Sequence, residues 1–273
     1  DPGFFRLENR KHRYRDWKKG GHGTRVDLHE AIVESCDTYF YSAGVKMGIE
    51  QLFRYGSRFG FGHKTGIDMP SERPGIMPSP DWKRGARGVA WYPGDTVNSS
   101  IGQGFMLATP LQLSVAASRL ASRGEIRSPR MVRAVGEDAI GSRPPAGIIE
   151  AAPSHWDYVL GAMRDVVHGE RGTARRIAEG ITYEMAGKTG TAQVVNIAQD
   201  AEYDAEELEK HQRDHALFIA YAPVEEPQVA IGILVENGEH GSTTAAPIAR
   251  QVFDVYMGLS DDRGEVLAAD VPE

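Results

Sequence analysis

Residues 188–191 read Lys-Thr-Gly-Thr, which places one cation beside two hydroxyl groups. They lie within residues 185–195, a stretch whose composition predicts a β-strand. On a strand, Gly190 removes a side chain that would block bound substrate from approaching the Lys188 ammonium. Thr189 and Thr191 offer hydroxyls to an anionic group, and the Thr191 N–H could supply half of an oxyanion hole. An exposed strand with an ordinary solvated lysine explains the same residues equally well.

Ser35 and Asp37 flank Cys36 at a predicted break between two helices. A serine and a short polar residue two positions apart can project into one cleft at such a break. There Ser35 could relay protons, and Asp37 could hold a backbone group or a lysine. Ser and Asp are also favoured N-cap residues, and helix capping is the simpler explanation of this pair alone.

A third group of residues has the chemistry of metal ligands. Asp1, Asp16, His22 and Cys36 combine oxygen, nitrogen and sulfur donors, a set that suits tetrahedral zinc. Their spacing is not that of a zinc finger, and a buried inert thiol would account for Cys36 by itself. Cys36 is the only cysteine, so an internal disulfide is excluded.

The elements that must position these groups follow from periodicity and cap signals. Asp27, with Glu30 three positions on, predicts a capping box at the start of a helix. Further helices are expected at 38–47, 51–59, 110–122, 156–167 and 245–257, and strands at 185–195, 216–222 and 228–236. The proline-rich residues 66–94 predict an irregular surface excursion, and the acidic residues 200–211 an exposed helical one. Helices followed by a late meander and a terminal helix predict an α+β fold with an antiparallel sheet.

Composition excludes several broad classes of protein. The chain of 273 residues is 41% hydrophobic and 25% charged, as in an ordinary globular protein. A net charge of −7 without a dense basic run argues against a nucleic-acid partner. No apolar run reaches the roughly 18–20 residues that a membrane helix needs. Because residues 1–3 form a turn signal rather than a natural start, we expect a piece of a longer protein.

Nine stretches, in order along the chain, resemble the transpeptidase domain of class B penicillin-binding proteins. The resemblance is to the branch that serves elongation in rod-shaped Gram-negative bacteria. The stretches are residues 1–3, 15–19, 21–23, 34–41, 94–96, 101–104, 108–112, 188–193 and 236–238. They cover the chain to near residue 238, so we expect a partial transpeptidase domain over 1–259 and a polar tail over 260–273. The expected fold is that shared with serine β-lactamases, with its N-terminal part missing.

The resemblance implies a serine acyltransferase that cross-links peptidoglycan stem peptides at their D-Ala-D-Ala ends and is inhibited by β-lactams. By the same resemblance, Ser35 relays a proton, Asp37 fills the third position of the second motif, and Lys188 is an electrostatic anchor. Thr189 and Thr191, beside Gly190, would bind the substrate carboxylate. The family also implies a structural zinc held by the four metal-ligand candidates, which are Asp1, Asp16, His22 and Cys36.

Two departures from the family pattern matter. Asp37 stands where most of the superfamily has Asn. More importantly, no serine is followed three positions later by lysine, so the Ser-x-x-Lys nucleophile motif is absent. Nucleophile and base act as a unit, so we expect them before Asp1 and expect this chain to be inactive alone.

The resemblance also implies a setting for the longer protein. The parent would be anchored in the inner membrane with this domain in the periplasm, working with a membrane glycosyltransferase and other elongation-complex proteins. Two alternatives stay open. One is a non-catalytic scaffold of the same fold that binds stem peptide or partner proteins. The other is a metallohydrolase that uses Asp16, His22 and Cys36.

Overall fold

The structure is a computed structural model that describes residues 1–195 and 208–259. Most of the predicted acidic excursion at 200–211 and all of the predicted tail at 260–273 lie outside the described residues. The division of the chain after residue 259 therefore stays a prediction.

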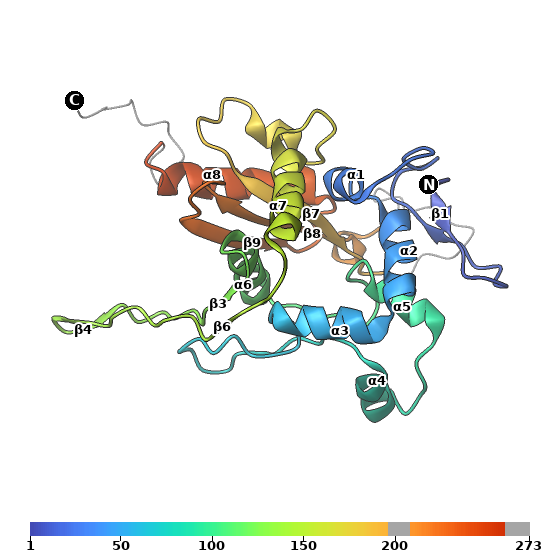
Figure 1. Ribbon diagram of the computed structural model, residues 1–273, viewed down its shortest axis with the longest axis horizontal. Coiled ribbons are helices and arrows are strands. Elements are labelled where there is room, and N and C mark those ends of the chain that lie inside the picture. The colour runs from blue at the N-terminus through green and yellow to red at the C-terminus, as the bar shows by residue number, and fades with distance from the viewer. Residues whose placement is uncertain (196–207, 260–273) are drawn as a thin grey trace.

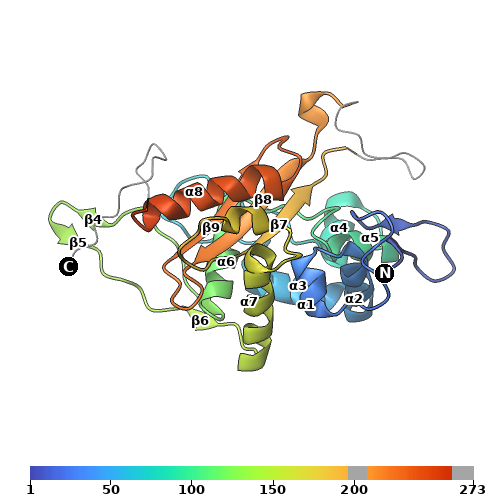
Figure 2. The same cartoon turned by 90° about the horizontal axis from the view of Figure 1, so that it is seen from above.

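A three-stranded antiparallel sheet forms the centre of the molecule. Its strands are β7 (Ala186–Ala192), β8 (His215–Ala222) and β9 (Val229–Val235), in the order β7-β8-β9. One face is covered by α8 (Ala246–Tyr256) and the other by α6 (Pro110–Ala121) and α7 (Pro153–His168), as Figures 1 and 2 show. The predicted antiparallel sheet flanked by helices is confirmed, and β7 lies at an edge of it.

The core fills the space between the sheet and these helices. Phe218 and Tyr221 of β8 are almost fully buried, as are Val166 of α7 and Phe253 of α8. Gly232 on β9 permits the close approach of α6, because a Cβ there would lie 2.7 Å from the Ser114 nitrogen. Burial of this apolar surface is the main term that holds the helices against the sheet.

Short helices form the rest of the body beside the sheet (Figure 1). They are α1 (Leu28–Val33), α2 (Asp37–Met47), α3 (Ile49–Arg58), α4 (Pro80–Arg87) and α5 (Pro93–Ser99), with the small pair β1 (Phe4–Phe5) and β2 (Tyr14–Arg15) alongside. The predicted capping box is confirmed, since the Asp27 carboxylate accepts the Glu30 N–H at 2.8 Å and Glu30 returns the bond. This cap fixes where α1 begins.

The expectation of an irregular surface excursion at 66–94 holds for residues 66–79 but is wrong for the helical residues after them. That stretch contains α4 and the start of α5, and in each helix a proline occupies the first turn rather than breaking it. Ser79 caps α4 by accepting the Trp82 N–H. Lys83 of α4 is buried, and its ammonium lies 2.5 Å from the Asp95 carboxylate of α5. This ion pair therefore ties α4 to α5, although most of the segment stays exposed.

An arm that the sequence did not suggest projects from the body between α6 and α7 (Figure 1). It is built from β3 (Glu125–Ile126) with β6 (Gly147–Ile148), and β4 (Ala134–Val135) with β5 (Asp138–Ala139). The short helices η1 (Arg175–Ala178), η2 (Lys210–Gln212) and η3 (Gly241–Ala245) complete the described elements. Within residues 1–195 and 208–259, no helix combines the length and apolar character needed to cross a bilayer.

Candidate active site and metal cluster

The two catalytic candidates that are farthest apart in sequence meet in the structure. Lys188 lies on the edge strand β7, and its Nζ donates to the Ser35 hydroxyl at 2.7 Å and to the Thr189 carbonyl at 2.9 Å. Ser35 lies in the turn between α1 and α2. Packing of these helices beside β7 thus joins a serine and a lysine that lie 153 positions apart.

Ser35 has an unusual backbone conformation. Its φ of +58° is in the left-handed region, which is unfavourable by about 1–2 kcal/mol for a residue with a side chain. The next residue closes the turn, because the Cys36 N–H donates to the Ala31 carbonyl at 2.9 Å. Such a conformation persists only where the surroundings impose it, and it directs the Ser35 hydroxyl to Lys188.

Asp37 begins α2 and is held from outside the helix. One of its carboxylate oxygens accepts the Trp17 N–H at 3.1 Å. Burial, and then the nearby Asp16 charge, raise the pKa of Asp37 to about 6, while the Lys188 ammonium acts in the opposite direction. Burial lowers the pKa of Lys188 to about 8, with Asp37 opposing. The site therefore holds a lysine that loses its proton far more easily than usual.

The remaining residues of the Lys-Thr-Gly-Thr motif lie along the same strand. The Thr189 hydroxyl is 2.9 Å from the hydroxyl of Thr173, a residue that the sequence did not single out. Thr191 is exposed, and its hydroxyl donates to the Glu239 carbonyl at 3.5 Å. Among the described residues, the nearest atom to a Cβ on Gly190 would be in Leu217, at 3.4 Å, an ordinary contact. Packing within the chain thus gives no reason for glycine here, which favours a role in ligand approach.

Gln103 lies in the matched stretch 101–104, to which the sequence assigned no role, and it touches the edge strand directly. Its Nε2 donates to the Thr191 carbonyl at 2.7 Å, and its Oε1 accepts the Gln193 N–H at 3.4 Å. The flanking Gly102 and Gly104 both have φ near +76°. A glutamine between two such glycines was the available signal, because the loop needs glycine on both sides to present it.

The four metal-ligand candidates also come together. One potential ligand atom from each of Asp1, Asp16, His22 and Cys36 lies within 4.8 Å of the others. His22 Nδ1 is 2.8 Å from Asp1 Oδ2 and 3.5 Å from Asp16 Oδ1, and Cys36 Sγ is 3.3 Å from Asp1 Oδ2. Ligands on a tetrahedral zinc are separated by roughly 3.3–3.8 Å, given bonds of about 2.0–2.3 Å. The distances therefore fit a zinc site with little rearrangement.

Backbone N–H groups hold the two carboxylates of this cluster in place. Asp1 accepts the N–H groups of Gly3 at 2.7 Å and His22 at 2.9 Å. Asp16 accepts the Thr38 N–H at 3.0 Å. Gly21 is required beside them, because its φ is +74° and a Cβ there would lie 2.3 Å from the Asp1 carbonyl oxygen.

The electrostatics of this cluster also favour a cation. The side chains of Asp1, Asp16 and His22 are 3%, 0% and 2% exposed, so two carboxylates are held close together away from water. His22 Nε2 is buried and has no hydrogen-bond partner among the described residues. Burial raises the pKa of the Cys36 thiol to about 11. A divalent cation would compensate the carboxylates and convert the thiol to a thiolate ligand.

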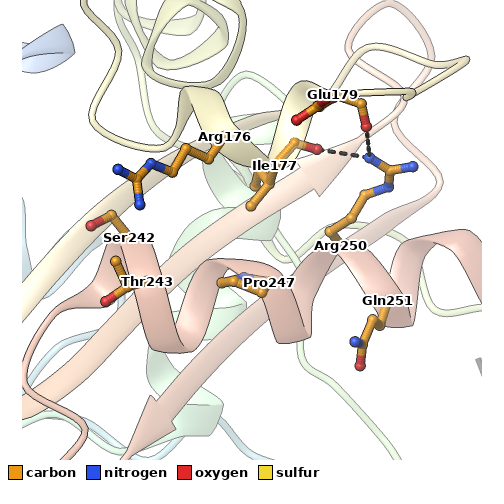
Figure 3. A pocket seen from close by; sticks show the side chains of 8 residues that line it. All are labelled: Arg176, Ile177, Glu179, Ser242, Thr243, Pro247, Arg250 and Gln251. Carbon is orange, nitrogen blue, oxygen red and sulfur yellow. Dashed lines mark hydrogen bonds between the residues drawn. The ribbon is translucent and has the colours of Figure 1, made fainter.

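A separate pocket lies between η1 and α8 and shares none of these residues (Figure 3). Arg250 spans it: one Nη donates to the carbonyls of Ile177 at 2.7 Å and Glu179 at 3.1 Å. Its Nε also bonds both carboxylate oxygens of Asp254. With its guanidinium used in this way, Arg250 joins two elements of the fold.

An edge strand carrying Lys-Thr-Gly-Thr beside a serine of a helical region is the arrangement of a penicillin-binding acyltransferase site. The family described as penicillin binding protein transpeptidase domain matches residues 4–254. The chain therefore belongs to the penicillin-binding-protein transpeptidase family.

Similar proteins agree in sequence and in fold. The peptidoglycan D,D-transpeptidase MrdA of Acinetobacter baumannii is 44% identical over 94% of this chain and 38% of its own length. MrdA of Escherichia coli K12 is 37% identical over 98% of this chain and 42% of its own length. The crystal structure of Pseudomonas aeruginosa PBP2 in complex with WCK 5153 matches with a TM-score of 0.84 and 43% identity, covering all of this chain and 56% of that one. The chain thus spans about two fifths of the length of these curated relatives.

Proposed function

We propose that the protein to which this chain belongs is a peptidoglycan D,D-transpeptidase that works through a serine acyl-enzyme. The hydrogen bond from Lys188 to Ser35, made at the free edge of β7, carries this proposal. It places a proton-carrying pair next to a strand edge that can bind an extended peptide. The membership of the transpeptidase family supports the same activity.

The residues take complementary roles in this reaction. The terminal carboxylate of the acyl donor binds the hydroxyls of Thr189 and Thr191 close to the Lys188 ammonium. The Ser35 hydroxyl passes a proton to the departing D-Ala amine, with Lys188 holding that hydroxyl in place. The Thr191 N–H lies on the side of β7 away from β8, as the Thr191 carbonyl does. There it stabilises the negative oxygen that forms when the peptide carbonyl of the substrate is attacked.

The nucleophile of this reaction is a serine of a Ser-x-x-Lys motif outside the present sequence. A labelling experiment on the intact parent protein and on this chain alone tests the proposal. Fluorescent penicillin should form one adduct on the intact protein, mapping outside this chain, and none on this chain alone. Lys188→Ala and Ser35→Ala in the intact protein should slow labelling by about 10²-fold or more, whereas the exposed Ser154→Ala should not. An intact protein that takes no label would instead be a non-catalytic scaffold of the same fold.

The cluster of Asp1, Asp16, His22 and Cys36 is proposed to hold one structural zinc ion. Four protein donors fill a tetrahedral site and leave no position for water, so the metal would act on folding rather than in the chemical step. Cys36 lies between Ser35 and Asp37, and the bound metal would fix the turn that carries both. The short distances between the four donor groups support this assignment.

The parent is also proposed to act within the cell-elongation machinery. The chain is similar to Helicobacter pylori PBP2 from its complex with MreC, with a TM-score of 0.80 and 36% identity. It is also similar to a chain of a peptidoglycan synthase complex that coordinates polymerization and crosslinking. We therefore propose a periplasmic domain of an inner-membrane-anchored protein that works beside a glycosyltransferase. Stem peptides and β-lactams are its proposed ligands.

A further inference from the structure

The outer edge of β7 carries a side-chain contact that bears on peptide binding. In the described sheet β7 pairs only with β8, so no described strand pairs with the backbone groups on its other side. Backbone groups alternate between the two sides of a strand. Since the Thr191 carbonyl and the Gln193 N–H bind Gln103, the groups of Thr189, Thr191 and Gln193 face away from β8. We call these groups the outer edge.

The Gln103 side chain occupies part of this outer edge. Its carboxamide bonds the Thr191 carbonyl and the Gln193 N–H at once, at 2.7 and 3.4 Å. A primary carboxamide has the same donor and acceptor as a backbone amide. Gln103 therefore occupies two backbone groups that an added strand would use, and the glycines on either side hold it there.

An extended peptide on the outer edge would compete with this side chain. An antiparallel peptide whose carboxyl end lies at Lys188 and Thr189 has its amino-terminal residues at Gln193. Pairing there requires the Thr191 carbonyl. A carbonyl can accept two bonds, but the Gln103 carboxamide also binds the Gln193 N–H and so lies where the peptide backbone would run.

We propose that Gln103 is a displaceable plug on the outer edge of β7, which a long acyl-donor peptide must expel in order to pair beyond Thr191. This inference rests on the proposed function, because it takes the ligand to be a peptide that ends in D-Ala-D-Ala. A short donor needs only the Lys188–Thr191 part of the edge and leaves the plug in place. Gln103 therefore lowers the affinity for long peptides and leaves the affinity for short ones unchanged.

Binding of two peptides by the intact parent protein tests the plug. The probes are an L-Lys-D-Ala-D-Ala tripeptide and a stem pentapeptide with the same carboxyl end, with affinity measured by calorimetry. Gln103→Ala should tighten pentapeptide binding about three- to tenfold, the equivalent of one net hydrogen bond, and change tripeptide binding less than twofold. Gln103→Asn, whose amide is one methylene shorter, should behave like Gln103→Ala. Gln51→Ala, at an exposed glutamine of α3, should change neither affinity.

Other outcomes would overturn the plug. If Gln103→Ala binds the pentapeptide more weakly than the wild type, Gln103 contacts the ligand. If the affinities for both peptides change equally, Gln103 only stabilises the local structure. Hydrogen exchange gives a second measurement: the Gln193 amide should exchange faster in Gln103→Ala than in the unliganded wild type. Penicillin labelling shows whether the plug alone is wrong or whether the proposed function is wrong as well. If the wild type is labelled but peptide length makes no difference, only the plug is wrong, whereas no labelling and no peptide binding would refute the proposed function with it.

Discussion

The Lys188 ammonium and the Ser35 hydroxyl are joined by a hydrogen bond of 2.7 Å across the junction between the sheet and the helices. An ammonium has three N–H donors. Among the residues that the structure describes, Ser35 and the Thr189 carbonyl use two of them, which would leave the third for the anionic end of a ligand. The contact thus holds the Ser35 hydroxyl against Lys188 and, under the proposed function, places the ammonium where a substrate carboxylate would bind.

The lowered pKa of Lys188 predicts a specific dependence of stability on pH. Its native pKa is about 8, against 10.5 ordinarily, so between these values the unfolded chain binds more protons than the native one. The free energy of unfolding should therefore rise with pH across this window. Urea denaturation between pH 7.5 and 10 should show a rise larger by about 1–3 kcal/mol in the wild type than in Lys188→Met. The exposed Lys46→Met is the control, and an unchanged rise in Lys188→Met would contradict the prediction.

The left-handed conformation of Ser35 predicts different stabilities for two variants that both lack the hydroxyl. Ser35→Gly and Ser35→Ala each lose the bond to Lys188, but only glycine adopts a φ of +58° without strain. Ser35→Gly should be more stable than Ser35→Ala by about 1 kcal/mol in chemical denaturation. Equal stabilities would show that the turn relaxes when the hydroxyl is removed.

The ligand cluster predicts stoichiometric zinc. Native mass spectrometry should find one zinc ion per wild-type chain and none in Cys36→Ser. Because a ligand that binds only the native state stabilises it, chelation should lower the melting temperature of the wild type and not of the variant. His155→Ala, at an exposed histidine outside the cluster, should retain the metal. A wild-type chain without metal would make Cys36 an ordinary buried thiol.

Two neighbouring glycines provide a matched test of the metal-site backbone. Gly20 and Gly21 both have positive φ, so alanine is strained at either position. Only at Gly21 does the new Cβ collide with the Asp1 carbonyl, since nothing lies within 4 Å at Gly20. Gly21→Ala should therefore weaken zinc binding at least tenfold more than Gly20→Ala in a competition titration with a chromogenic chelator. Comparable affinities would mean that Asp1 is not a ligand.

The pocket between η1 and α8 predicts a contrast between two arginines (Figure 3). Arg250→Met removes bonds to two carbonyls and leaves the Asp254 carboxylate without its guanidinium partner. We expect a loss of about 1–3 kcal/mol in thermal or urea denaturation. The exposed Arg176→Met should change stability by less than about 0.5 kcal/mol. Similar effects for the two would show that Arg250 does not join the elements.

Local signals predicted much of the fold. The capping box at Asp27 and the hydrophobic strands β8 and β9 were recognisable, because their determinants lie within a few residues. The helices α4 and α5 were missed because proline has two meanings: it breaks a helix interior but is favoured at the first position. The two helices are joined by the ion pair Lys83–Asp95. Charged residues are normally expected at the surface, so nothing in the sequence indicates that these two pair with each other.

The sequence predicted which residues form the site but not how they contact one another. The family resemblance selected Lys188, Ser35 and the four cluster residues, and the structure brings each set together. That Lys188 touches Ser35 depends on how α1, α2 and β7 pack, which spacing alone does not specify. Gln103 and Thr173 were missed because their importance arises from long-range contacts with Thr191 and Thr189.

The free edge of β7 has a consequence for solubility. An unpaired strand edge can template sheet formation with another copy of the same chain. A site that must accept extended peptides cannot be closed by a permanent neighbouring strand. Here the Lys188 ammonium and the Gln103 carboxamide each occupy an outward carbonyl, on Thr189 and Thr191. These two side chains thereby also protect the protein from edge-to-edge aggregation.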